Sequence, residues 1–528
     1  MSENEWDGNR ITFDQAHQMT YVIVGSDVVT PVQHMNLRVT FHKPEDIRLP
    51  GVTEPRLVLK KDDTRASGKQ AGRFTFSSCH YDPVTGEARL SYDVDGLILH
   101  EKITFPWNPW PVDASRQAAF FQALELLHLV AGISYYKAGL ASRIDTGDSK
   151  IDGVMAEFLK DLYLLGLGEF AYINKLDLTE LINFETKAEV ETQADAEAET
   201  VDKSRDKPGS QSGFSYPVDL PERALVAMGG GKDSLVCLQI LRDAGIDVQP
   251  VCVGGSGLIG DTVKATGLPL IRIRRELSPE LTEMNANGAW NGHVPVTAIN
   301  SAILLCAGLL YGYRYIVFAN ESSANEATLK DAQGREVNHQ YSKSLAFEQA
   351  FVTVAKNHVS PGIEYFSLLR PFTEIAITRR FSELTEFHEV FSSCNRNFHQ
   401  DGSHITDRWC KDCPKCRFAA LALAPFLTPK QLCAIQGADL LDEVEQLQGF
   451  KALCGIGEHK PFECVGSISE SRAAMKVLTK DPQWQGKTII SELAQYAEIQ
   501  QAGQLEIQPD FTAPHCIPAE ILARLNAF

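Results

Sequence analysis

From residue 221 onward, short apolar runs alternate with segments whose apolar residues recur at helical spacing. The runs predict strands at 224–228, 248–253, 268–273, 315–320 and 364–368. The intervening pattern predicts helices at 235–241, near 261, at 294–311, at 342–355 and from 373. Repeated strand–helix units are typical of a doubly wound parallel sheet that binds ligands at the carboxyl ends of its strands. The predicted fold class is therefore α/β.

The pattern upstream of this region differs. Residues 1 to about 110 hold alternating or continuous apolar runs that predict strands, and 118–131 and 154–167 have helical spacing. From Glu189 to Asp202 there are six acidic residues and no basic one, which predicts a disordered tether. The residues after 427 are mostly helical in pattern. We therefore expect an α+β domain at 1–185, an acidic linker at 186–220, a sheet domain with a cysteine cluster at 221–427 and a helical region at 428–528.

Composition limits the classes of function. The chain has 528 residues, enough for two or three domains, and 44% of them are hydrophobic. The net charge of −18 argues against a nucleic-acid partner, because such proteins usually carry a basic surface. No run of about 18 uncharged apolar residues is present, and the acidic N-terminus lacks an apolar signal region. We expect a cytoplasmic protein without a membrane span.

A glycine-rich stretch joins the strand at 224–228 to the next helix. It consists of Gly229, Gly230, Gly231, Lys232, Asp233 and Ser234. Glycines allow close backbone approach, and the free N–H groups and dipole of a helix N-terminus favour an anion. The stretch therefore predicts a phosphate site. It lacks the spacing of a Walker loop and of the GxGxxG dinucleotide motif.

This stretch, GGGKDS, resembles the SGGxDS pyrophosphate loop (PP-loop) of the ATP pyrophosphatase superfamily. Its members cleave ATP between the α- and β-phosphates and adenylate a substrate. The resemblance implies ATP and Mg²⁺, with Asp233 facing the phosphates and backbone at Gly254 holding the adenine. The first serine of that pattern is Met228 or Gly229 here. Asn320, at the end of the strand at 315–320, is a further nucleotide-binding candidate, and Glu321 beside it a further Mg²⁺ candidate.

Four cysteines lie close together near the end of the sheet domain. Cys410, Cys413 and Cys416 form C-x-x-C-x-x-C, and Cys394 precedes them by one loop. Four thiolates suit tetrahedral Zn²⁺ and would leave no position open for chemistry. The pattern resembles the zinc knuckle of cyano-deazaguanine synthase, another PP-loop enzyme. An iron–sulfur cluster, or a histidine ligand from the intervening loop, remains an alternative.

Several polar stretches fall in predicted loops, where function concentrates. They are NGHVPVTAINS from residue 291, FANESSANE from 318, VNHQYSKS from 337, SLLRPFTE from 367, SCNR from 393 with WCKDCPKC from 409, and KPFECVG from 460. Together with GGGKDS they resemble the UDP-N-acetylmuramoyl-L-alanyl-L-glutamate epimerase family. The resemblance covers residues 224–466, and SYYKAG at 134–139 shows a weaker similarity to the same family.

That family converts the terminal L-Glu of UDP-MurNAc-L-Ala-L-Glu to D-Glu and releases AMP and pyrophosphate. The resemblance implies an acyl-adenylate and acid/base groups at Cα, for which His293, Cys464 and Glu463 are candidates. Arg370, Arg396 or Lys343 are candidates for the γ-carboxylate or the UDP diphosphate. The alternatives are a nucleobase- or tRNA-modifying enzyme of the PP-loop superfamily and a non-catalytic nucleotide sensor. The oligomeric state is not predicted.

Overall fold

The computed structural model describes strands within residues 1–32 and then residues 70–525 with internal gaps. The gaps are 107–109, 112, 150, 187–214, 256, 327–328, 331–333, 398–406, 458–459, 462 and 464. Most of the predicted acidic linker and the candidate Cys464 therefore lie outside the described residues. The chain divides into two compact units, Met1–Ser67 and Gly68–Phe528.

The first unit contains one antiparallel sheet. Its strands pair in the order β1-β2-β3-β4. They are β1 (Glu3–Trp6), β2 (Asn9–Asp14), β3 (Met19–Val24) and β4 (Asp27–Val32). The expected β-rich start of the chain is confirmed for these segments.

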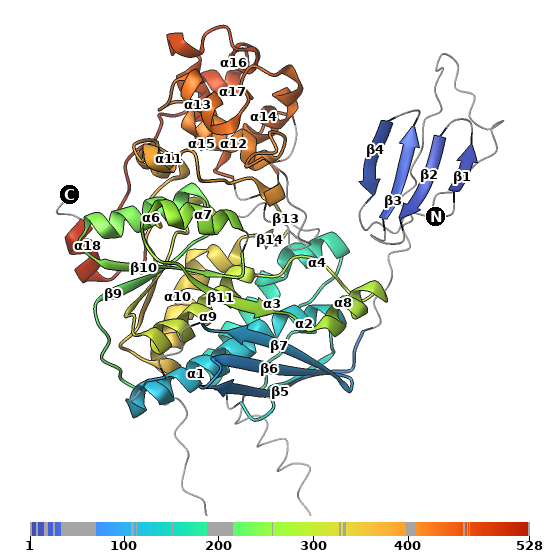
Figure 1. The fold of residues 1–528 in the computed structure, drawn as a ribbon, viewed down its shortest axis with the longest axis vertical. Helices are drawn as coiled ribbons and strands as arrows, with labels where there is room; N and C mark the ends of the chain where they lie inside the picture. The colour runs from blue at the N-terminus through green and yellow to red at the C-terminus, as the bar shows by residue number, and fades with distance from the viewer. Residues whose placement is uncertain are drawn as a thin grey trace, which may run out of the picture. The chain divides into compact units, whose positions relative to one another are not determined.

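The second unit is built on a nine-stranded mixed sheet, ordered β15-β12-β9-β10-β11-β7-β6-β5-β8. Figure 1 labels β9, β10, β11, β7, β6 and β5 of this sheet. The five strands from β15 to β11 are parallel. They are β9 (Arg223–Ala227), β10 (Asp247–Val253), β11 (Ile271–Glu276), β12 (Tyr315–Phe318) and β15 (Glu364–Ser367). The other four are β5 (Arg73–Asp82), β6 (Glu87–Val94), β7 (Leu97–Thr104) and β8 (Arg143–Asp145). An α/β fold with a sheet dominated by parallel strands is thus confirmed.

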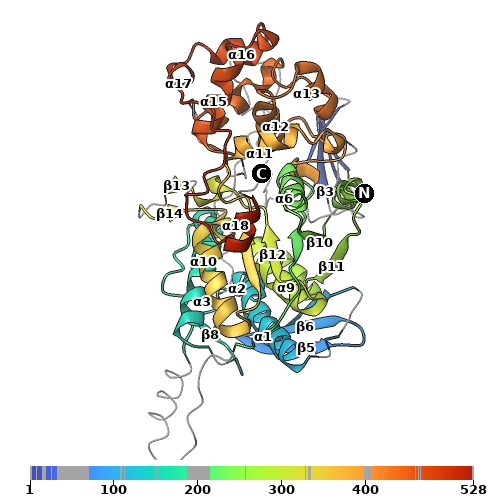
Figure 2. The same ribbon diagram turned by 90° about the vertical axis from the view of Figure 1, so that its left-hand side faces the viewer.

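Helices cover both faces of the parallel strands. Successive side chains along each strand point to opposite faces, so each strand contributes to two cores. Leu225 and Ile316 belong to one buried core, whereas Val226 and Val317 belong to the other. The first core includes helices α1, α3, α9 and α10, and the second includes α6, α11 and α12 (Figure 2). The near-continuous apolar runs read from the sequence are explained by this burial on two sides.

The helices up to the end of the sheet region are α1 (Ala114–Ala131), α2 (Ile133–Gly139), α3 (Gly153–Gly166), α4 (Gly168–Asn174), α6 (Lys232–Asp243), α7 (Gly257–Ala265), α8 (Pro279–Ala286), α9 (Val296–Tyr311), α10 (Leu345–Val354) and α11 (Glu374–Ser382). The helices after it are α12 (Pro414–Leu423), α13 (Pro429–Gln436), α14 (Leu447–Leu453), α15 (Ile468–Leu478), α16 (Thr488–Leu493), α17 (Ala497–Gln500) and α18 (Ala519–Leu525). The mostly helical C-terminal region is confirmed. Strand β11 begins later than expected, after Pro269, which has no N–H to give to a ladder.

The strands preceding residue 110 join the central sheet. Strand β7 pairs antiparallel with β11. Across this junction the buried Glu101 accepts a 2.7 Å hydrogen bond from Arg275, which also donates to Ser134. Residues 68–184 and the parallel strands therefore share one sheet and one core. The domain boundaries drawn from the sequence stay predictions.

One described helical stretch, Ala114–Gly139, is long and apolar enough to cross a membrane. It contains Arg116, Glu125 and Lys137, so it is not one of the uncharged apolar runs whose absence the sequence analysis noted. Of its most apolar window, 78% is buried inside the protein. Helix α1 packs along α9 in the first core, which accounts for its apolar surface.

Candidate active site

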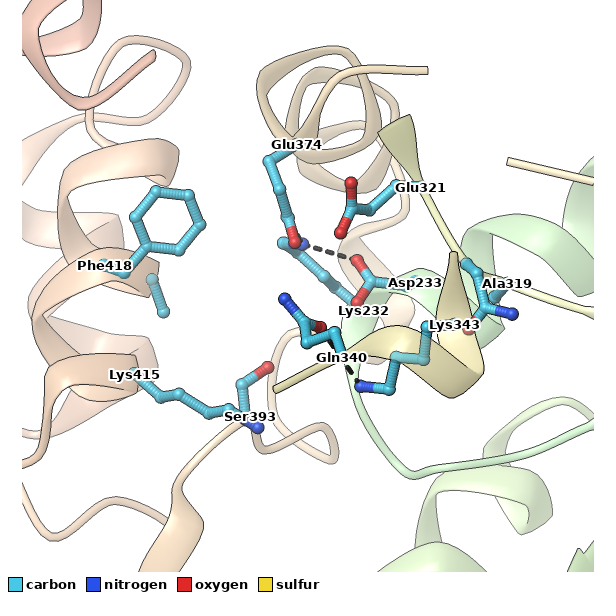
Figure 3. A pocket seen from close by; sticks show the side chains of 12 residues that line it. Lys232, Asp233, Ala319, Glu321, Gln340, Lys343, Glu374, Ser393, Lys415 and Phe418 are labelled. Carbon is cyan, nitrogen blue, oxygen red and sulfur yellow. Dashed lines mark hydrogen bonds and ion pairs between the residues drawn. The ribbon is translucent and has the colours of Figure 1, made fainter. Parts of the chain in front are cut away.

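A pocket lies next to the carboxyl ends of β9 and β12, where the chain switches from one side of the sheet to the other. Strand β9 lies between β10 and β12, so the chain continues from β9 to one side and later returns to the other. In open α/β sheets such a switch point, at the carboxyl ends of the strands, is where ligands bind. The empty space in and around the pocket amounts to about 620 Å³, which includes open solvent. It is lined by Lys232, Asp233, Ala319, Asn320, Glu321, Gln340, Lys343, Glu374, Ser393, Lys415, Phe418 and Ala419 (Figure 3).

The glycine loop forms the turn between β9 and α6. Gly230 has a φ of +79°, a conformation that side-chain-bearing residues rarely adopt. Gly231 is the N-cap of α6 and offers no side-chain oxygen to the first N–H groups of the helix. A Cβ at Gly229 would meet no atom within 4 Å. The helix N-terminus therefore keeps N–H donors that an anion can accept.

Lys232 and three carboxylates occupy one side of the pocket. The buried Lys232 ammonium donates to Asp233 at 2.5 Å and also to Glu374. Burial alone would lower the pKa of Lys232, but these two carboxylates outweigh it and the pKa is raised. Glu321 projects into the same space as Asp233 and Glu374 (Figure 3).

Burial and mutual repulsion raise the pKa of both Glu321 and Glu374. For Glu321 the repelling charges are on Glu470 and Asp233. For Glu374 they are on Asp233 and Glu321, and Lys232 opposes them only in part. Neighbouring carboxylates are costly to ionise together, which is the physical reason for the raised pKa values.

Two further lysines border the pocket, which suits a polyanion. Lys343 lies in the short helix Tyr341–Lys343 and approaches Gln340, with the ammonium 3.5 Å from the amide oxygen. Lys415 extends from α12 on the other side, near Ser393 (Figure 3). Phe418, on the same helix, supplies an apolar wall. Carboxylates and lysines thus face one cavity.

Arg370 supports this pocket from behind. It is 2% exposed and pairs with the equally buried Glu348 at 2.8 Å. Its other hydrogen bonds go to the backbone carbonyls of Glu321 and Lys343, at 2.8 and 2.6 Å. The expectation that Arg370 binds a substrate anion is wrong in this structure, because its charge is already satisfied and enclosed.

The four predicted metal-ligand cysteines converge. Their sulfur atoms all lie within 4.8 Å of one another, with 3.7 Å between Cys410 and Cys416 and 3.5 Å between Cys413 and Cys416. Zn–S bonds of about 2.3 Å in a tetrahedron place sulfurs about 3.8 Å apart, so the set fits zinc. The backbone N–H of Cys410 donates to the sulfur of Cys394, and that of Cys413 to the sulfur of Cys410, both at 3.3 Å. The cluster could therefore hold a metal such as zinc; loop residues 398–406, with the histidines weighed as ligands, lie outside the described part.

This cysteine cluster adjoins the pocket at two points. The Ser392 N–H donates to the carbonyl of Gly230 at 3.2 Å, and Ser393 next to Cys394 lines the pocket. Helix α12 begins at Pro414, inside the C-x-x-C-x-x-C segment, and carries Lys415 and Phe418. A metal bound by the cysteines would therefore fix one wall of the pocket.

His293 lies beside the pocket, outside its lining. Its Nδ1 is 3.4 Å from a carboxylate oxygen of Glu169 on α4. Burial lowers the pKa of His293 to about 4, aided by the positive charges of His339, Lys343 and Lys137. The imidazole is thus neutral near pH 7 and able to accept a proton.

Other predicted residues lie elsewhere or make internal contacts. The Ser234 hydroxyl donates to the Gly231 carbonyl, and the Gly254 N–H donates to Ile273. Glu463 accepts from the side chain of Asn395, beside the cysteine cluster. None of Ser234, Gly254 and Glu463 is among the pocket-lining residues, and their assigned roles stay predictions. Asn320 lines the pocket and donates to the hydroxyl of Ser367.

The pocket also contains residues that were given no role of their own in the sequence analysis. They are Gln340, Glu374, Ser393, Lys415 and Phe418. The first four lie within the polar stretches named there, and Phe418 lies outside them. Glu374 opens the helix after the last parallel strand, so its position at a strand's carboxyl end was a further usable signal.

Comparison with known proteins gives a consistent result. The MurL N-terminal domain model matches residues 65–368, more than half of the chain, and the MurL C-terminal domain model matches 390–507. A Xanthomonas oryzae protein is 42% identical over 462 residues, which cover 87% of this chain and 98% of that protein. Proteins from Salinispora tropica and a Micromonospora species are 37% and 38% identical over 80% of this chain, covering 88% and 90% of theirs. All three are named UDP-N-acetyl-alpha-D-muramoyl-L-alanyl-L-glutamate epimerase.

Proposed function

The chain belongs to the MurL family, and on this premise we propose that it is an ATP-dependent isomerase of peptidoglycan precursor synthesis. It inverts Cα of the terminal Glu in UDP-MurNAc-L-Ala-L-Glu and releases AMP and pyrophosphate. The observation that carries the ATP-dependent part is the pocket at the strand switch point, with its glycine loop, carboxylates and lysines. The relatives' names support the substrate.

ATP serves a kinetic purpose in this proposal. L- and D-epimers differ little in energy, so inversion needs no driving force, but a proton on Cα beside a carboxylate is very weakly acidic. An α-carboxylate oxygen attacks the α-phosphorus of ATP, and the bond to pyrophosphate breaks. The resulting acyl-adenylate has lost the carboxylate charge, and its carbonyl shares the electron pair left when Cα loses its proton. Each pKa unit gained at Cα is worth about 1.4 kcal/mol.

In this proposal the positively charged groups of the pocket bind the phosphates and the carboxylates bind the metal ion. The N–H groups at the start of α6, with Lys232 and Lys415, bind the phosphates. Asp233, Glu321 and Glu374 would hold Mg²⁺, and the ion would supply positive charge to the phosphates. The four cysteines would hold a structural zinc.

Proton transfer at Cα needs a group that accepts on one face and another that donates on the opposite face. His293 is proposed as the acceptor, since it is neutral near pH 7 and close enough to Lys343 for the lysine's charge to lower its pKa. Cys464 and Glu463 stay candidates for the second group. The returned proton completes inversion, and water then cleaves the acyl–phosphate bond to give the D-Glu carboxylate and AMP.

The decisive experiment is turnover in D₂O. With ATP and UDP-MurNAc-L-Ala-L-Glu, we expect deuterium at Cα of the product, together with AMP and pyrophosphate. Without ATP, or with an α,β-non-cleavable analogue, no exchange should occur. Inversion without ATP, or release of ADP and phosphate, would refute the proposal. If nucleobases or tRNA are adenylated instead, the chain is a nucleic-acid-modifying enzyme of the PP-loop superfamily.

A further inference from the structure

One buried lysine next to His293 has no role in the proposed function so far. Lys137 lies on α2, where every residue is buried, and is 6% exposed. Its ammonium donates to the side-chain oxygen of Asn291 at 3.1 Å and to the carbonyl of Gly292 at 3.0 Å. Both acceptors are neutral. Within the described part of the chain no carboxylate pairs with it.

Such an arrangement is costly for a folded protein. Taking an ammonium out of water disfavours its charged form, and neutral acceptors replace only part of the lost hydration. Burial accordingly lowers the pKa of Lys137 to about 8. Most of the molecules still carry the charge at pH 7. A cation kept in this position needs a reason other than packing, because an apolar side chain of similar length would cost less.

The contacts of Lys137 place it against the loop that carries His293. Gly292 directly precedes His293 and has a φ of +153°, where side chains are strained. The Trp290 N–H donates to the Ala138 carbonyl at 3.2 Å, which ties the same loop to α2 a second time. The loop is thus held against the helix on either side of Asn291.

The groups that face His293 come from four parts of the fold. They are Lys137 on α2, Glu169 on α4, His339 in the turn before the short helix Tyr341–Lys343, and Lys343 within it. Glu169 favours a protonated imidazole, and the two lysines and His339 disfavour it. Lys137 is the member of this set whose charge is held in place by the loop itself.

We propose that Lys137 is a positioning residue, which holds the Asn291 side chain and the Gly292 carbonyl next to His293 and whose positive charge adds to burial in disfavouring a protonated imidazole. The inference rests on the proposed role of His293 as the acceptor of the Cα proton. It assigns a purpose to a motif of the chain, SYYKAG, that lies about 150 residues before the histidine. It also predicts that removing the charge of Lys137, with a hydrogen bond to Gly292 kept, changes the protonation midpoint of His293.

The test separates charge from hydrogen bonding. Lys137→Gln keeps an amide donor for the Gly292 carbonyl but removes the charge, and Lys137→Arg keeps the charge. Histidine protonation is followed by NMR of ¹³Cε1-labelled histidine in the full chain, with His293→Gln to assign the signal. In Lys137→Gln the His293 midpoint should rise by roughly half a pH unit to one unit, as loss of one nearby charge predicts. Lys137→Arg should leave the midpoint unchanged.

Activity gives a second readout. In Lys137→Gln, Cα deuterium incorporation should fall by roughly one-and-a-half- to threefold at pH 4.5, match the wild type above pH 6 and leave pyrophosphate release intact. Lys264→Gln, an exposed change on α7, is the matched control and should alter neither. Equal His293 midpoints in the Gln and Arg variants would overturn the inference even if wild-type turnover is normal. Absence of turnover in the wild type would refute the proposed function instead, and the NMR result would still decide the role of Lys137. If Lys137→Gln does not fold, Lys137→Met takes its place as the variant without the charge.

Discussion

The buried ion pair behind the pocket allows a quantitative prediction. Glu348→Gln removes the charge that faces Arg370, and both side chains are 1% exposed. The carboxylate accepts from two guanidinium nitrogens, at 2.8 and 3.3 Å, and from the Ser367 N–H at 2.9 Å. Glutamine offers one acceptor oxygen, and its NH₂ would face one of these donors. A buried guanidinium without its anion costs about 3–5 kcal/mol of unfolding free energy.

The measurement is urea unfolding followed by circular dichroism, with Glu276→Gln as the matched control. Glu276 pairs with Arg274 at 3.9 Å, and these side chains are 52% and 73% exposed. Loss of such a surface pair costs at most about 1 kcal/mol. The double variant Glu348→Met, Arg370→Met should recover much of the stability, since no charge is left buried. It should not recover nucleotide binding, because Arg370 also holds the backbone of Glu321 and Lys343. A Glu348→Gln loss no larger than the control's would refute this reasoning.

Three other predictions address the site directly. Asp233→Asn should fold normally and lose most pyrophosphate release, measured in a coupled assay; unaltered release would remove Asp233 from the phosphate site. Cys413→Ser should lower both the zinc content, expected at about one per chain by elemental analysis, and the melting temperature, whereas Cys433→Ser, outside the cluster, should change neither; an iron-containing wild type would contradict zinc. Glu321 has a pKa raised to about 7, chiefly by burial, so Mg²⁺–ATP binding near pH 7 should release protons, seen by calorimetry in two buffers of different ionisation enthalpy. Because the folded state holds this proton and the unfolded state does not, the contribution of Glu321 to stability without ligand should fall as the pH rises from about 4.5 toward 7, and a rise over that range would contradict the assignment.

Much of the parallel sheet could be predicted from local pattern. A strand buried on both faces must be apolar throughout, and its helix must place apolar residues at a spacing near 3.6, so both signals are written in short windows. Strands β9, β10, β12 and β15 overlap the predicted runs for this reason. The glycine loop was equally visible, because Gly230 needs a backbone conformation that few other residues tolerate.

The joining of β7 to β11 was not predictable in the same way. Both strands show ordinary strand patterns, and nothing local says which edge pairs with which. The buried Glu101–Arg275 pair across the junction reads in sequence as two charged, and so exposed, residues. Burial of a charge depends on a partner 174 positions away, which only the folded chain supplies.

The candidate site likewise combines features that local sequence patterns indicate with contacts between distant segments. The glycine loop and the C-x-x-C-x-x-C segment could be recognised from residues close together in the chain, since the geometry of such segments is set within a few residues. Long-range packing was needed to show that Glu374 and Lys415 join Lys232 in one pocket, that Arg370 is enclosed beside it, and that Lys137 lies against the His293 loop. Those side chains meet through the packing of separate helices on the sheet, and their charges act on one another only because that packing removes the water between them.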